Sequence, residues 1–142
     1  ESNLRAGTEN TPAIMSFKVA VESLDKENFS SFKQAFISNL SGDYYLISDE
    51  NCVDNIISVC FAGVRGETIA HMVESKGYLI GTGSACNSGT KINRVIASIV
   101  PKKYAEGALR ISFDADVTVK DCEDLAQTIS NAVSEYRKTL NR

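Results

Sequence analysis

One cysteine stands in a segment whose composition differs from the rest of the chain. Cys86 lies within residues 81–90, ten small residues that include three glycines and no large apolar side chain. This composition predicts a loop. Free cysteine is usually buried, so a thiol on an exposed loop is either a reactive group or a chance loop cysteine. A reactive thiol needs a base, a cation or a helix N-terminus nearby, and Lys91 and Arg94 follow where the next helix is expected to begin.

The same loop does not match the patterns that bind nucleotide phosphates. Gly81 and Gly83 begin a dinucleotide fingerprint, but Cys86 occupies the position of its third glycine. Gly89 is followed by Thr and then Lys, which reverses the order of a P-loop. We therefore predict no nucleotide site here.

The remaining cysteines and the single histidine are interpreted as structural. Cys60 falls in an expected strand, Cys122 on the apolar face of the last expected helix, and Cys52 in a turn. The spacing of the four cysteines matches no zinc-ligand pair, so no metal site is predicted. His71 lies within an expected helix and has no local motif that joins it to Cys86, which favours a structural histidine over a catalytic base.

Arg110 is a second candidate for chemistry, because it interrupts an apolar strand. It lies between Leu109 and Ile111 in the expected strand 108–113. A charge in that setting needs an anionic partner, and the planar guanidinium holds a carboxylate with two bonds. The partner is either a carboxylate of the core or the carboxylate of a ligand, and the sequence leaves both open.

The elements that position these residues follow from hydrophobic periodicity. Apolar residues at three- and four-residue steps predict helices over 11–40, broken near 25–28, and over 68–75, 92–99 and from the cap Thr118 to Leu140. Strands are predicted over 44–47, 56–61, 78–80 and 108–113. Asn10 or Thr11 is expected to cap the first helix, and Gly77 to end the second. Together they predict an α+β fold, a single domain over 1–142 with helices packed on a mostly antiparallel sheet of about three to four strands.

Length and charge exclude several classes of protein. The chain has 142 residues, of which 43% are hydrophobic, and a net charge of −3. This balance offers no reason to expect a nucleic acid as partner. No apolar run approaches the roughly 20 residues of a membrane span, so no membrane partner is expected. With no secretion signal at the start, free thiols in a reducing cytoplasm are expected.

Three segments together resemble a known family in order and spacing. They are Arg-Ala-Gly-Thr-Glu-Asn over 5–10, Gly-Ser-Ala-Cys-Asn-Ser-Gly over 83–89 and Leu-Arg-Ile-Ser-Phe over 109–113. They resemble the cysteine desulfurases of the iron–sulfur-cluster and nitrogen-fixation type, within the class V aminotransferases of fold type I. The resemblance covers nearly the whole chain and corresponds to the small C-terminal domain of those enzymes.

The resemblance implies roles for three residues. Cys86 matches the mobile-loop nucleophile that takes sulfur from L-cysteine as a persulfide and so releases L-alanine. Arg110 matches the arginine that holds the substrate carboxylate. Thr8 matches the threonine that reaches the phosphate of pyridoxal 5'-phosphate in the opposite subunit of a homodimer. The implied partner is a sulfur-acceptor protein, either a cluster scaffold or a tRNA-thiolation protein.

The family's cofactor lysine follows a histidine, whereas His71 is followed by Met72. We therefore expect that lysine to be absent from this chain and the isolated chain to be inactive. Two other functions stay open: a stand-alone sulfur-carrier or docking module, and a dimerisation module in which Cys86 is incidental.

Overall fold

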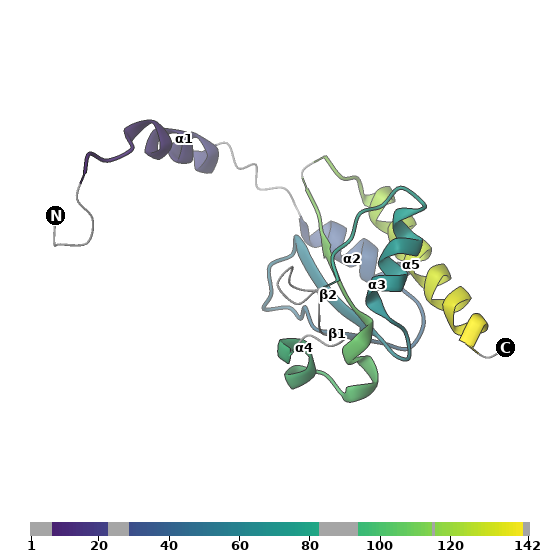
Figure 1. Cartoon of the computed structure of the whole chain (residues 1–142). Coiled ribbons are helices and arrows are strands. Elements are labelled where there is room, and N and C mark those ends of the chain that lie inside the picture. The colour runs from purple at the N-terminus through teal and green to yellow at the C-terminus, as the bar shows by residue number, and fades with distance from the viewer. Residues whose placement is uncertain (1–6, 23–28, 83–93, 115, 141–142) are drawn as a thin grey trace.

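A three-stranded antiparallel sheet forms the centre of the protein (Figure 1). The computed structural model describes residues 7–22, 29–82, 94–114 and 116–140. The strands are β1 (Tyr44–Leu46), β2 (Ile56–Phe61) and β3 (Ala108–Ser112), with β2 in the middle. The predicted α+β class and the antiparallel sheet are confirmed.

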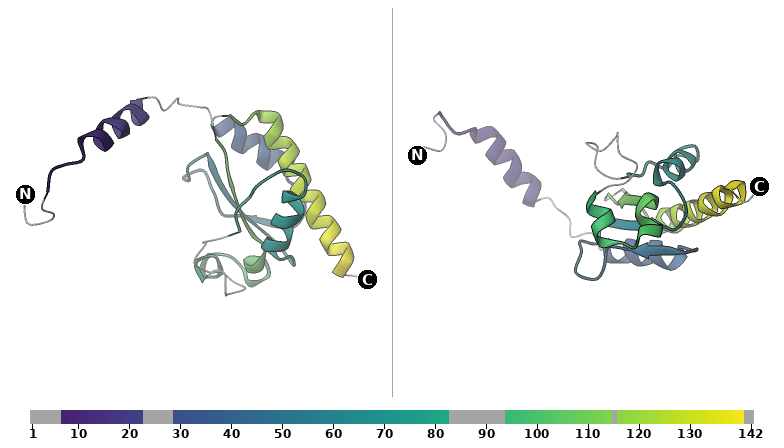
Figure 2. Two further views of the ribbon diagram at one scale, coloured as in Figure 1. Left: turned by 45° about the horizontal axis from the view of Figure 1, so that its top comes forward. Right: turned by 60° about the horizontal axis from the view of Figure 1, so that its bottom comes forward.

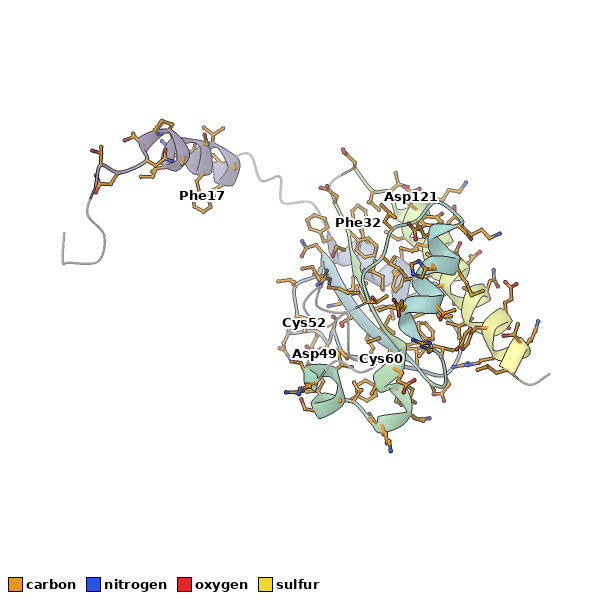
Figure 3. The ribbon with its side chains drawn as sticks, in the orientation of Figure 1. Phe17, Phe32, Asp49, Cys52, Cys60 and Asp121 are labelled. Carbon is orange, nitrogen blue, oxygen red and sulfur yellow. The ribbon has the colours of Figure 1, made fainter. Side chains whose placement is uncertain are left out.

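Three helices cover one face of this sheet. They are α2 (Phe29–Asn39), α3 (Gly66–Glu74) and α5 (Val119–Leu140). Successive strand side chains point to opposite faces, so Ile57, Val59 and Phe61 of β2 all reach the helices, and each is 0% exposed. Phe32 and Phe36 bring α2 into the same core cluster (Figure 3).

Local hydrogen bonds fix where the helices begin and end. Thr118 Oγ1 accepts the N–H of Asp121 at 3.2 Å, and Asp121 Oδ2 accepts the N–H of Thr118 at 2.9 Å. This reciprocal capping box starts α5 as predicted. Asn10 Oδ1 accepts the N–H of Ala13 at 3.1 Å and caps α1 (Thr11–Glu22). Gly77 follows α3 with a φ of 93°, the left-handed conformation predicted for that helix end.

The second face of the sheet is covered over only part of its area. The short helix α4 (Arg94–Ile99) and the 3-10 helix η2 (Lys102–Gly107) lie there, and Cys60 packs with Tyr104 and Ala108 in a small second cluster. No described element covers the part of this face that carries Arg110 and Ser112, and both residues are exposed. We call this uncovered part the open face.

Helix α1 lies apart from the sheet in all views (Figures 1 and 2). Its predicted helical conformation is confirmed, but none of its residues is buried. Phe17 is 72% exposed and Ile14 57% exposed (Figure 3). The apolar stripe predicted on this helix is therefore not packed against the rest of the described chain.

Two elements differ from the sequence prediction. Residues 78–80 do not form a strand, because the N–H of Tyr78 bonds back to Val73 O at the end of α3 and only Gly81 pairs with β3. The helix η2 was not predicted; it follows Pro101, whose carbonyl accepts the N–H of Tyr104 at 2.9 Å. Within the described residues, no helix is both long enough and apolar enough to cross a membrane.

Candidate functional site

The side chain of Arg110 lies on the open face of the sheet. Its neighbours Leu109 and Ile111 are each 1% exposed and face the helices, whereas Arg110 is exposed. No carboxylate of the described residues forms an ion pair with its guanidinium. Of the two partners that the sequence leaves open, a carboxylate of the core is not found among the described residues. The strand alternates, and Arg110 occupies the side that the helices do not cover.

Gly81 is the backbone neighbour of Arg110 on the free side of β3. The N–H of Arg110 donates to Gly81 O at 2.7 Å, and the N–H of Gly81 donates to Arg110 O at 2.9 Å. A Cβ atom on Gly81 would lie 3.3 Å from Arg110 Nη2 and 3.4 Å from Nε. The guanidinium therefore lies over Gly81, which has no side chain to displace it.

Ser58 is the neighbour of Arg110 on the other side. The two residues are Cα partners in the register of β2 and β3. Both backbone groups of Arg110 are bonded to Gly81, so Ser58 and Arg110 form a non-hydrogen-bonded pair, the kind in which facing side chains stand closest. The signal that could have identified Gly81 and Ser58 is strand pairing, which a single sequence does not supply.

Cys86 lies outside the described residues, between Thr82 and Arg94. The described chain reaches Thr82, directly after the Gly81 bridge, and resumes at Arg94. The start of the segment that carries Cys86 is therefore bonded to Arg110, which is one of the three predicted site residues.

Thr8 is exposed ahead of α1, and α1 lies apart from the sheet (Figure 1). The structure does not bring Thr8 to Arg110 within this chain. His71 is 72% exposed on the outer surface of α3, where its Nδ1 lies 3.2 Å from Glu74 Oε2. Since α3 packs on the helix-covered face, His71 does not lie on the open face.

The other thiols divide by burial. Cys60 and Cys122 are 0% exposed, as predicted for structural cysteines. Burial raises the pKa of each thiol to about 11, and the nearby carboxylate of Asp121 adds to the effect at Cys122. Cys52 is exposed, and its thiol lies 3.5 Å from Asp49 Oδ1 (Figure 3). No group of three or more metal-ligating side chains occurs in the described part of the chain.

A polar cluster ties the start of β1 to η2 and α5. Asp43 Oδ1 accepts the hydroxyl of Tyr104 at 2.7 Å, and Oδ2 accepts Lys103 Nζ at 2.9 Å. These two hydrogen bonds, the Tyr104 bond foremost, hold the pKa of Asp43 below its ordinary value. Arg137 of α5 donates to the carbonyl oxygens of Ala62 and Asp43. Sequence reasoning missed this cluster, since its members are far apart along the chain.

Comparison with known proteins defines the family. The family model described as Aminotransferase class-V matches residues 1–125, so the chain belongs to the class-V aminotransferase family. The cysteine desulfurase of Gluconacetobacter diazotrophicus is 29% identical over 150 residues, covering 97% of this chain and 38% of that protein. The cysteine desulfurase IscS of Dictyoglomus turgidum is 30% identical, covering 96% of this chain and 38% of that protein. The chain thus spans about two fifths of the length of these relatives.

Solved structures share the fold. A NifS-like protein has a TM-score of 0.65 at 24% identity, covering 93% of this chain and 36% of that structure. The NifS-like protein of Rickettsia africae has a TM-score of 0.61 at 21% identity, covering 92% and 37%. The predicted family resemblance is confirmed, and these structures support the fold class.

Proposed function

We propose that this chain is the part of a cysteine desulfurase that supplies the nucleophile Cys86 and the carboxylate-binding Arg110, in the small C-terminal domain of that enzyme. The observation that carries the proposal is the exposed guanidinium of Arg110, which pairs with no described carboxylate and is hydrogen-bonded through its backbone to the start of the Cys86 segment. Relatives named cysteine desulfurase support the same reaction.

The chemistry follows from the two side chains. Arg110 receives the carboxylate of L-cysteine through two parallel N–H donors. The thiolate of Cys86 then attacks the substrate sulfur, which loses its proton. A sulfur–sulfur bond forms as the carbon–sulfur bond breaks, and the electron pair of the broken bond stays with the substrate carbon, which takes up a proton to give L-alanine. Cys86 is left as a persulfide.

The cofactor of this reaction would be held by Thr8 among the described residues. When bound, pyridoxal 5'-phosphate supplies the electron sink that lets the carbon–sulfur bond break. Thr8 is exposed and lies three residues before the start of α1 at Thr11, so its hydroxyl is free of the helix and can donate to a phosphate oxygen. Thr8 does not meet Arg110 within one chain, which agrees with the proposal that it serves the opposite subunit of a homodimer.

The chain between the Gly81 bridge and Cys86 is short. Cys86 follows Thr82 by four residues, and four residues of extended chain span at most about 14 Å. Cys86 is therefore tethered within reach of a ligand on Arg110. The persulfide is passed to a sulfur-acceptor protein, either a cluster scaffold or a tRNA-thiolation protein.

Two substitutions test the proposal in the protein as it occurs in the cell. Arg110→Ala is expected to raise the KM for L-cysteine by about 10- to 100-fold, because it removes charged hydrogen bonds worth about 1.5–3 kcal/mol. Arg65→Ala is the matched control, since Arg65 is an exposed arginine next to α3 with only a 3.7 Å ion pair to Glu67. An unchanged KM for Arg110→Ala contradicts the role of Arg110.

Cys86→Ala is expected to abolish both sulfide release and the mass increase of one sulfur on the protein, while substrate binding persists. Cys52→Ala is the control, because Cys52 is an exposed cysteine outside the proposed site. If Cys86→Ala leaves desulfurase activity unchanged, the cysteine is incidental and the chain is a dimerisation module. Sulfur on Cys86 after incubation with a persulfide donor, in a protein that cannot desulfurate L-cysteine, supports instead the sulfur-carrier module.

A further inference from the structure

Ser58 presents a hydroxyl to the open face directly beside Arg110. Its backbone is turned the other way: the N–H donates to Ser48 Oγ at 2.8 Å and the carbonyl accepts the N–H of Ile47 at 2.9 Å. The side chain is half-buried and forms no hydrogen bond with another described residue. The hydroxyl is therefore available to a ligand on this face.

Gly81, Arg110 and Ser58 form one row across the sheet. Gly81 pairs with Arg110, and Arg110 is in register with Ser58. Residues directly opposite in antiparallel pairs share a face, so all three point to the open face. Neighbouring strands lie about 4.8 Å apart, which places Gly81 and Ser58 about 9.5 Å from one another.

The row carries two donors, the guanidinium of Arg110 and the hydroxyl of Ser58. The guanidinium leans over Gly81 and away from Ser58, as its close approach to a Cβ position on Gly81 shows. A carboxylate has two oxygens, so it can accept from the guanidinium with one and from the hydroxyl with the other, at about 2.7–2.9 Å each.

We propose that Ser58 Oγ is a further donor to the substrate carboxylate, and so a specificity-determining residue for amino acids with a free carboxylate. The inference rests on the proposed role of Arg110. A carboxylate only accepts hydrogen bonds, and Arg110 occupies only part of its accepting capacity. A serine at position 58 supplies such a donor on a short side chain.

Kinetics with L-cysteine test this in the cofactor-loaded protein as it occurs in the cell. Ser58→Ala is expected to raise KM about tenfold and to change kcat by less than about twofold, because the carboxylate contact is the same in ground and transition states. Ser58→Thr, which keeps the hydroxyl, restores most of the affinity. Ser75→Ala is the matched control: Ser75 Oγ donates to Met72 O on the far side of the sheet, at the end of α3.

Binding without turnover gives an independent result. Calorimetry compares L-alanine with ethylamine, which lacks the carboxylate. Ser58→Ala is expected to reduce the preference for L-alanine about tenfold, and to have less than a twofold effect when Arg110→Ala is already present. If Arg110→Ala weakens L-alanine binding and Ser58→Ala does not, the role of Ser58 is overturned while the proposed function stands. If Arg110→Ala also leaves L-alanine binding unchanged, the proposed carboxylate site itself is overturned.

Discussion

Thiol labelling separates the structural cysteines from the reactive ones. Cys60 and Cys122 are 0% exposed and have pKa values raised to about 11 by burial, whereas Cys52 is exposed. The thiolate, not the neutral thiol, attacks an alkylating reagent such as iodoacetamide and displaces its iodide. We therefore expect iodoacetamide to modify Cys52 rapidly in the folded chain and to leave Cys60 and Cys122 nearly untouched.

The magnitude follows from the change of pKa on folding. In the unfolded chain a thiol has its ordinary pKa of 9.0. At pH 8 about 10% of such a thiol is ionised, compared with about 0.1% at a pKa of 11, which is a hundredfold difference. Burial also keeps the reagent away from these thiols, which slows labelling further. Cys60 and Cys122 should therefore each label at least about 100-fold more slowly in the folded chain than in urea.

The assay is a time course at pH 8 with peptide mass spectrometry of each cysteine, in buffer and in urea. Cys52 is the internal control, because its exposure predicts little protection by folding. Cys86 is expected to label at least as fast as Cys52 if it is the nucleophile. Labelling of Cys60 or Cys122 in the folded chain within tenfold of its rate in urea would refute the burial argument.

Three further predictions concern stability and are checked by urea unfolding. Phe36→Ala should cost about 3–5 kcal/mol, because Phe36 is 0% exposed in the main core. Gly107→Ala should cost about 1–3 kcal/mol, since its Cβ would overlap the carbonyl of Phe61; wild-type stability would show that η2 shifts freely. Asp43→Asn should lower stability at pH 7, because it weakens the bond to Tyr104. The folded-state pKa of Asp43 is depressed, so its contribution is present above 3.8 and is lost as the pH falls below that value. The difference from wild type should therefore shrink in acid, and a constant difference down to about pH 3 contradicts the assignment.

Elements with strong local signals are those that the sequence predicts well. The apolar steps of α5 and the Thr118 box lie within one segment, so nothing beyond that segment is needed to identify the helix. The β-forming composition of β2 is equally local, and this predicted strand forms over Ile56–Phe61.

The structure differs from the sequence prediction where the conformation or packing of an element depends on residues far away in the sequence. Residues 78–80 have a strand composition, but the N–H of Tyr78 is taken by α3 and only Gly81 reaches β3. The apolar stripe of α1 resembles that of α2, yet only α2 finds a described surface to cover. Periodicity shows that a face is apolar and does not show what packs on it.

The environment of Arg110 could not be predicted from the sequence. In sequence it reads as a charge enclosed by Leu109 and Ile111, but those two residues face the helices and Arg110 faces away from them. Along the same side of β2 and β3, the covered part carries Cys60 and Ala108, and the open part carries Ser58, Arg110, Ser112 and the exposed Ile56. The three polar residues therefore gather where the sheet stops serving the core. That boundary becomes visible only once β2, β3 and Gly81 are placed in register, because the row that holds Arg110 is assembled from three separate segments of the chain.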